Sequence, residues 1–176
     1  MKRLKLATVW LDGCSGCHMS LLDMDMAILE VAPRVDLVYG PLVDAQEFPE
    51  GVDVTLVEGA VSSQDDLKKV HKIRGRTRTL VALGDCAVTS NVPAMRNSMT
   101  PQKLLQAVYV EHAQDSRVVP ADGVPALLAQ ARPVHEFVKV DVHVPGCPPT
   151  PKAIVTLLQD LLAGRKPDAN PKVKFG

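Results

Sequence analysis

The chain has 176 residues, with 20 basic and 20 acidic side chains that cancel to a formal net charge of zero. Phosphate binding needs a sustained positive field, so this balance argues against a nucleic-acid partner. No stretch approaches the roughly 20 consecutive apolar residues that span a bilayer, which argues against a membrane-embedded subunit. Hydrophobic residues make up 46% of the chain but aromatic residues only 3%, so we expect one compact domain with a largely aliphatic core.

Runs of strand length alternate with longer helical patterns along the chain. The first run, LKLATVWL, follows basic residues as in a signal peptide, but it is short and leads into a cysteine motif rather than a cleavage site. It is therefore interpreted as the first strand of a cytoplasmic protein. In chain order, the predicted strands are residues 4–11, 35–39, 52–57, 79–83 and 138–144. The predicted helices are residues 17–31, 62–74, 92–110 in one or two pieces, 124–132 and 151–163.

This alternation indicates an α/β fold of the flavodoxin-like kind, a doubly wound parallel sheet with helices on both faces. The first predicted helix carries a one-sided apolar stripe that we expect to pack in the core, formed by Met19, Leu22, Met26 and Leu29. Residues 111–125 mix charge, proline and glycine, as surface loops do. We predict a single domain over residues 1–164 and a C-terminal tail over residues 165–176.

The cysteines of the chain follow predicted strands. Cys14 and Cys17 come after the first strand, Cys86 after a later one and Cys147 after the last. Glu58 ends a further strand, in the sequence VEGA. Ligands of open parallel sheets collect beyond the carboxyl ends of the strands, so we expect these side chains to share one edge of the sheet.

Four thiols at one edge are compatible with several kinds of site. Two disulfides would suit an oxidising compartment, and a redox dithiol would use only the C-x-x-C pair. A four-cysteine zinc site usually has two short knuckles, whereas the intervals here are long. We favour a 4Fe-4S cluster, because each iron takes one thiolate and the sheet can gather distant ligands. Close backbone approach at Gly13, Gly16 and Gly146 would suit it, and prolines 148 and 149 would stiffen the last loop.

Four segments carry a resemblance to a known family: LDGCSGCHMSLLDMD, VEGAV, GDCAVTSNVPAMRN and VPGCPPTPKAI. Together they resemble the small subunit of cytoplasmic nickel-iron hydrogenases, specifically the NAD-reducing group, from about residue 4 to about residue 164. The resemblance implies one proximal 4Fe-4S cluster, with a ligand set consisting of Cys14, Cys17, Cys86 and Cys147. The nickel-iron centre of such enzymes lies on a separate large subunit.

Differences from other members of the superfamily favour the NAD-reducing type over the other types of small subunit. Periplasmic and membrane-linked small subunits carry a twin-arginine leader and a C-terminal domain with further clusters, and neither is expected here. The related quinone-reductase subunit of respiratory complex I has adjacent cysteines, whereas Ser15 and Gly16 separate Cys14 from Cys17. Sulfhydrogenase and deazaflavin-linked types are closer alternatives, against which the GDCAVTSNVPAMRN segment and the short chain favour the NAD-reducing type.

The function implied by the resemblance is that of a subunit of hydrogen dehydrogenase. Electrons from hydrogen would pass from the nickel-iron large subunit, through the cluster of this chain, to flavin- and iron-sulfur-containing diaphorase subunits that reduce NAD. FMN is not expected on this chain, because the loop DGCSGC that would cradle its phosphate is committed to the cluster. The alternative from a different class is a zinc-stabilised interaction module without a redox role.

Several residues near the predicted cluster have more specific expectations. Glu58 is predicted to lie partly buried beside the cluster and to act as an auxiliary proton relay. His18 is expected to form a hydrogen bond or an interface contact, and Arg96 to pair with a partner carboxylate or to be an ordinary surface charge. The five histidines do not cluster in sequence and show no metal-ligand spacing, so most are expected to be surface or packing residues.

We also predict that the cluster edge lies against the large subunit. The edge is expected to be formed by loops 12–20, 58–63 and 86–97. Its apolar side chains would make the contact, namely those of Met19, Val61, Val88, Val92 and Met95.

Overall fold

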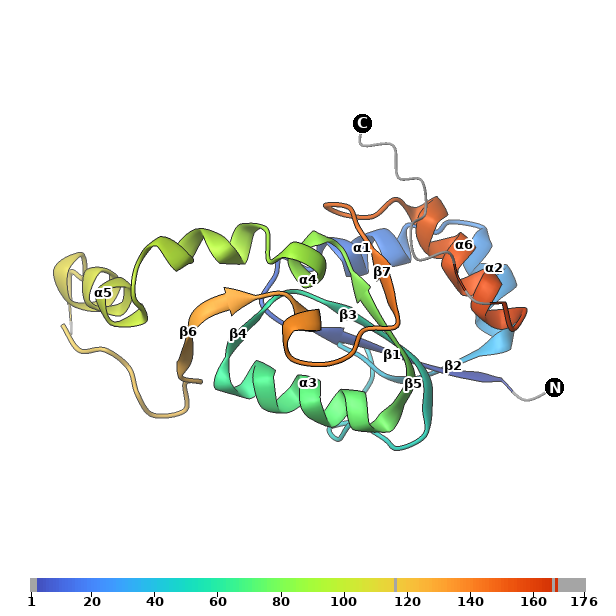
Figure 1. Cartoon of the computed structure of the whole chain (residues 1–176), viewed down its shortest axis with the longest axis horizontal. Coiled ribbons are helices and arrows are strands. Elements are labelled where there is room, and N and C mark those ends of the chain that lie inside the picture. The colour runs from blue at the N-terminus through green and yellow to red at the C-terminus, as the bar shows by residue number, and fades with distance from the viewer. Residues whose placement is uncertain (1–2, 116, 166, 168–176) are drawn as a thin grey trace.

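The computed structural model describes residues 3–115, 117–165 and 167, and its centre is a five-stranded parallel sheet (Figure 1). The strands are β1 (Leu4–Trp10), β2 (Val35–Tyr39), β3 (Val52–Glu58), β5 (Thr77–Leu83) and β7 (Val142–Val144), in the spatial order β2-β1-β3-β5-β7. This is the strand order of flavodoxin-like folds, so the predicted fold class is confirmed. The predicted C-terminal tail lies almost entirely outside the described residues.

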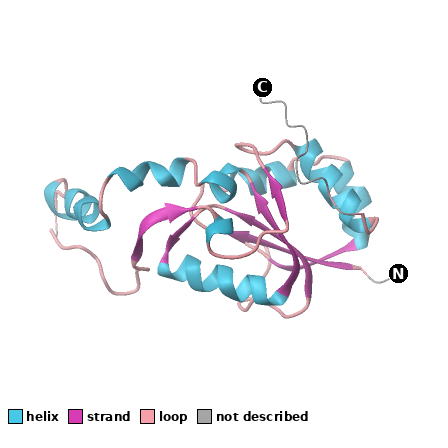
Figure 2. Cartoon of the chain, in the orientation of Figure 1, coloured by secondary structure: helices cyan, strands magenta, loops and turns pink. Residues whose placement is uncertain are grey.

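Helices cover both faces of the sheet (Figure 2). Helix α3 (Gln64–Arg76) packs on one face, where Val70 and Ile73 are buried against strand residues. Helices α1 (Gly16–Leu22), α2 (Ala27–Val31) and α6 (Pro151–Leu162), with the short 3-10 helix η1 (Ala32–Arg34), cover the other. Successive residues of β3 serve the two cores in turn, with Leu56 in one and Val57 in the other. Among the described residues, no helix has the length and apolar character needed to cross a bilayer.

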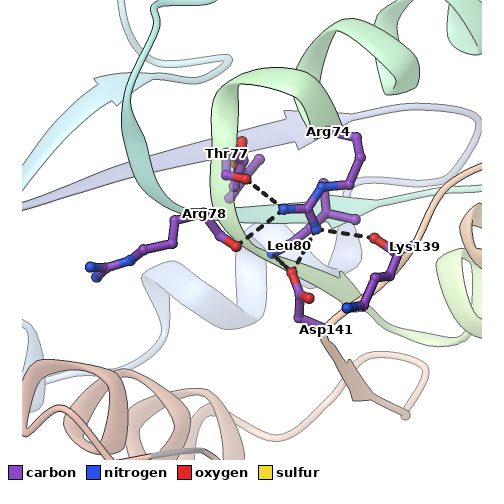
Figure 3. Close-up of polar contacts among 7 residues, drawn as sticks. Arg74, Thr77, Arg78, Leu80, Lys139 and Asp141 are labelled. Carbon is purple, nitrogen blue, oxygen red and sulfur yellow. Dashed lines mark hydrogen bonds and ion pairs between the residues drawn. The ribbon is translucent and has the colours of Figure 1, made fainter.

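The last sheet strand is shorter than predicted, and a hydrogen-bond network around Arg74 and Asp141 accounts for where it begins (Figure 3). Asp141 comes directly before β7, and its Oδ2 accepts hydrogen bonds from Leu80 N at 2.8 Å and from Arg74 Nη1 at 2.6 Å. Arg74 also donates to the carbonyls of Lys139 and Arg78. The side chain of Asp141 thus accepts the hydrogen bond from Leu80 N that a β7 carbonyl would otherwise accept. Regular pairing of β7 with β5 therefore starts only at Val142.

A second, two-stranded antiparallel sheet pairs β4 (Val61–Ser63) with β6 (Leu127–Arg132). The predicted helix over residues 124–132 is therefore wrong. The run LLAQAR suits a helix locally, but long-range hydrogen bonds override that preference. Asn97 binds both backbone groups of Ala131, at 2.8 and 2.9 Å, and Arg96 donates to the carbonyls of Leu128 and Ser62. Arg96 is half-buried and joins η2 to the β4–β6 sheet, so it is not an ordinary surface charge; its pairing with a partner carboxylate stays a prediction.

Between β5 and β6 the chain forms an arm that projects from the sheet (Figure 1). It begins with α4 (Asp85–Thr89) and continues through the 3-10 helix η2 (Val92–Ser98), α5 (Pro101–Gln106) and the π-helical turn η3 (Ala107–Glu111). The predicted helical region 92–110 is therefore present in three pieces. The 3-10 helix η4 (Val134–Glu136) leads back towards β7.

The predicted helix 17–31 is interrupted, and its apolar stripe does not pack in the core. The chain turns between α1 and α2, where Asp25 has a positive φ of 52°. The expected core stripe is exposed at all four positions, Met19, Leu22, Met26 and Leu29. The turn rotates the second half of the pattern, so Met24 and Val31 are buried instead.

Candidate functional site

The strands that precede the cysteines end level with one another. The register aligns Trp10 with Glu58, Glu58 with Leu83, and Leu83 with Val144 across neighbouring strands. The loops after these positions therefore start from one edge of the sheet. They carry Cys14 and Cys17 after β1, Cys86 in α4 and Cys147 after β7, all as free thiols. The predicted convergence of the cysteine loops and Glu58 at one edge is found in the structure.

Backbone hydrogen bonds hold two of these loops in register. Gly84 N donates to Val144 O at 2.7 Å, which extends the pairing of β5 and β7 beyond the strands. Asp85 N donates to Gly146 O at 3.1 Å, and Asp85 Oδ1 accepts from Gly146 N at 2.7 Å. Asp85 and Gly146 are the residues immediately before Cys86 and Cys147. The reciprocal pair therefore fixes the two cysteines relative to each other.

Glycines make room for the thiols. A side-chain carbon at Gly84 would lie closer than 3.0 Å to Cys17 Sγ, and one at Gly16 would lie 3.3 Å from Cys14 Sγ. Gly84 also has a φ of 91°, a backbone conformation that residues other than glycine rarely adopt. The sulfur of the first loop thus rests directly on the backbone of the loop after β5. A carbon at Gly146 would collide with Pro149 of the same loop, so this glycine is needed for the local turn; its predicted approach to a cluster stays a prediction.

Glu58 lies beneath the first cysteine loop and is only 2% exposed. Its Oε2 accepts a hydrogen bond from His18 N and is bonded to His18 Nδ1, each at 2.6 Å. His18 directly follows Cys17, so the carboxylate anchors the first turn of α1 to the end of β3. The hydrogen-bonding role expected for His18 and the burial expected for Glu58 are both found.

The electrostatics of the site disfavour free thiolates. Burial raises the pKa of the Cys17 thiol, and the negative charges of Glu58 and the other cysteines raise this pKa further. Burial also raises the pKa of Cys86, with Cys147 as the next contributor. A bound cation would stabilise such a crowded set of thiols in its deprotonated form.

The spacing of the donors differs from that of a single-ion site. Among the residues that the structure describes, no three His, Cys, Asp or Glu side chains are close enough to share one metal ion. A 4Fe-4S cluster does not need such closeness, because each thiolate binds a different iron. The donor set, four free cysteines from three loops at one edge of the sheet, is of the kind that such a cluster uses.

Apolar side chains surround the thiols. Met19, Val92 and Met95 are exposed at 62%, 60% and 75%. Val88 is half-buried, but Val61 is fully buried in β4, so its predicted place on the outer surface is wrong. A cavity of about 280 Å³ opens beside Met19, between α1 and the Pro41 turn. We call the exposed Met19, Val92 and Met95 the apolar rim. Val61, which was expected on the 58–63 loop, does not belong to it.

Sequence reasoning missed several contributors to this region. Gly84 and Asp85 begin the segment GDCAVTSNVPAMRN, but only their contacts with other loops reveal their roles. Asn91 gave no signal, although its Nδ2 lies 3.4 Å from Cys147 Sγ. The sequence also gave no signal for the one histidine pair seen among the described residues, in which the rings of His135 and His143 are 5.7 Å apart.

Comparisons with known proteins agree with this arrangement. The family model described as NADH ubiquinone oxidoreductase, 20 Kd subunit, matches residues 14–161. A vhu subunit of the F420-non-reducing hydrogenase of Methanocaldococcus jannaschii is 38% identical over 172 residues, which is 97% of this chain. The chain spans 60% of the length of that relative. NAD-reducing hydrogenase HoxS subunit delta of Cupriavidus necator is 38% identical over 168 residues, covering 93% of this chain and 80% of the relative.

A solved structure extends the similarity to three dimensions. One chain of an NAD⁺-reducing [NiFe]-hydrogenase in the H₂-reduced state superposes with a TM-score of 0.92 and 37% sequence identity. The match covers 99% of this chain and 100% of that one. The family model, the curated relatives and the structural match all include the cysteine loops, and the chain therefore belongs to the NADH:ubiquinone oxidoreductase 20 kDa subunit family, alongside hydrogenase small subunits.

Proposed function

We propose that this chain is the electron-transfer small subunit of an NAD-reducing nickel-iron hydrogenase that works in the cytoplasm. Cys14, Cys17, Cys86 and Cys147 would hold one 4Fe-4S cluster. The observation that carries the proposal is the meeting of four free thiols from three loops at one sheet edge. The HoxS delta subunit and the NAD⁺-reducing hydrogenase structure support the choice of enzyme.

The proposed reaction divides between chains. The large subunit would split hydrogen into two protons and two electrons, and a diaphorase module would combine two electrons and a proton with NAD⁺. When bound, the cluster would supply a carrier that takes one electron at a time. The residues of this chain hold that carrier in place: Asp85 locks two ligand loops together, Gly84 leaves room for Cys17, and Glu58 anchors α1.

Substitution of Cys147 by serine tests the cluster. We expect the anaerobically purified complex to lose iron and acid-labile sulfide from this subunit, or to hold a converted cluster with a changed electron paramagnetic resonance spectrum. Thr150→Ser is a matched control in the same loop, three residues after Cys147. It keeps the hydroxyl that caps α6, so it should leave the iron content unchanged. Unchanged iron and an unchanged spectrum in the Cys147 variant would exclude this ligand set. One bound zinc without sulfide would favour the interaction-module alternative.

The apolar rim supports an obligate partner at the cluster edge. Met19, Val92 and Met95 form part of it, and Cys14 and Cys147 are exposed within it. Burial against a nickel-iron large subunit would remove this surface from water and bring the two metal centres together. We expect native mass spectrometry of the co-expressed chains to show a stable heteromer, and Met95→Asp to weaken it. A soluble monomer as the functional species would contradict this.

We further propose that Glu58 acts as an auxiliary proton relay beside the cluster, in addition to anchoring α1. Its burial and its contact with His18 support this role. Glu58→Gln keeps the size of the side chain and an acceptor oxygen, so iron content should stay at the wild-type level while hydrogen-dependent NAD reduction slows. Turnover equal to wild type across pH, together with normal recovery from air, would leave Glu58 with the anchoring role alone.

A second candidate is a small subunit of another cytoplasmic hydrogenase type. The F420-non-reducing relative supports it, because its identity over the matched residues equals that of the HoxS subunit. The complete coverage of the NAD⁺-reducing chain favours the first candidate. Identifying the chains that co-purify separates the two: a flavin-containing diaphorase and hydrogen-dependent NAD⁺ reduction support the first. Reduction of a viologen dye but not of NAD⁺ would support the second.

A further inference from the structure

Asn91 lies next to the proposed cluster ligands, although it is far from them in sequence. Its side-chain amide donates a hydrogen bond to Cys147 Sγ, with Nδ2 3.4 Å from the sulfur. Sulfur is larger than oxygen, so hydrogen bonds to it are longer than those to carbonyls. The amide belongs to the segment between α4 and η2, while the sulfur belongs to the loop after β7.

Asn91 does not make the capping hydrogen bond that is common for an asparagine at the start of a helix. Asn91 directly precedes η2, where an asparagine oxygen commonly accepts a hydrogen bond from the first turn. Here the side chain makes no capping hydrogen bond. The side chain is turned to the thiol of another loop instead.

The backbone is strained where the amide is presented. Ser90 has a φ of 68° and Asn91 a φ of 27° with a ψ of −119°, so two consecutive residues other than glycine adopt positive φ. Such conformations persist only where surrounding contacts impose them, and they are concentrated at functional sites. Asparagine tolerates positive φ better than most residues, so a turn-forming role must be separated from a role of the amide.

We propose that Asn91 is a positioning residue that tunes the cluster of the proposed function by hydrogen bonding to the Cys147 thiolate, and that this bond raises the reduction potential. The inference rests on that proposed function. A donor at a ligand sulfur stabilises negative charge, and the reduced cluster carries one more negative charge than the oxidised one. Removing the donor should therefore make reduction less favourable.

Two glycine variants separate the amide from the turn. Asn91→Gly keeps a backbone that tolerates positive φ and deletes the donor, whereas the control Ser90→Gly relieves the neighbouring strain and leaves the donor in place. The measurement is a redox titration of the anaerobically purified complex, followed by electron paramagnetic resonance. We expect Asn91→Gly to keep its iron and to shift the equilibrium towards the oxidised cluster about tenfold, which is ~59 mV lower for a one-electron couple. Ser90→Gly should match wild type.

Every other result of the redox titration or the iron analysis would contradict a specific part of the proposal. A midpoint equal to wild type in Asn91→Gly, with full iron content, would exclude the tuning role. An equal shift in Ser90→Gly would assign the effect to the backbone, and loss of iron in Asn91→Gly alone would make the residue necessary for holding Cys147 rather than for tuning. Absence of a 4Fe-4S signal in the wild-type complex would overturn the proposed function itself, and the inference with it.

Discussion

The contact between Gly84 and the Cys17 sulfur allows a sharp test of how the site is built. In Gly84→Ala the new methyl group would overlap Sγ at a backbone position with a φ of 91° and a ψ of 174°. This region of conformational space is almost restricted to glycine, and occupying it costs about 1–3 kcal/mol. Overpacking adds about 1–3 kcal/mol. The combined cost of about 2–6 kcal/mol can be avoided only if the thiol or the loop moves away.

Displacement of Cys17 would remove one ligand of the proposed cluster, so we expect Gly84→Ala to lose most of its iron. The assay is iron and acid-labile sulfide per complex, with the melting temperature of the complex as a second readout. Gly51→Ala is the matched control, because Gly51 has a φ of 67° but nothing within 4 Å of the added carbon. It should be strained without an overlap and should keep its iron. Full iron and an unchanged spectrum in Gly84→Ala would refute the placement of the thiol on this glycine.

Three further perturbations follow from the contacts described above. Glu58→Ala removes two hydrogen bonds to a charged acceptor, each worth about 1.5–3 kcal/mol, so it should lower the melting temperature clearly more than Glu58→Gln; equal losses would contradict the anchoring role. In Asp141, hydrogen bonds from the Leu80 backbone and from Arg74 outweigh the effect of burial and lower its pKa, so its stabilisation is present above pH about 4 and is lost as the pH falls through the lower folded value. Asp141→Asn should therefore cost about 1–2 kcal/mol at neutral pH and less in acid, because the ion pair is partly exposed; a pH-independent cost in chemical denaturation would exclude this. Burial, and then His135, lowers the pKa of His143, so stability should fall as the pH drops below about 6.5, where the unfolded chain binds the extra proton. NMR titration should show this low pKa, and His135→Ala should raise it; no change would contradict the pairing.

The sequence pattern predicted the central sheet and the meeting of the cysteines for the same physical reason. Parallel strands begin and end together, so motifs placed directly after apolar runs must share an edge. That argument needs only the run and the residue after it, as in the stretches before Glu58 and Cys86. Burial of Glu58 also follows, because the residues directly before it, Leu56 and Val57, are apolar.

The missed features all depend on partners far away in sequence. The run that forms β6 looks helical until Asn97 and Arg96 bind its backbone. Asn91 reads as an ordinary loop residue, since its relation to Cys147 spans 56 positions. Periodicity reports on one element at a time, and these contacts join two.

The position of β7 has a consequence for the birth of the protein. This strand has three residues and is added at the edge of the sheet, beside β5, and the loop after it supplies Cys147. Domains begin to fold from the N-terminal side during synthesis, so the earlier thiols leave the ribosome well before the fourth. A nascent chain therefore offers an incomplete set of thiols until β7 has docked. Metal binding and folding stabilise each other. The proposed cluster would therefore be loaded only after the ribosome has synthesised the last strand of the sheet and the loop that follows it.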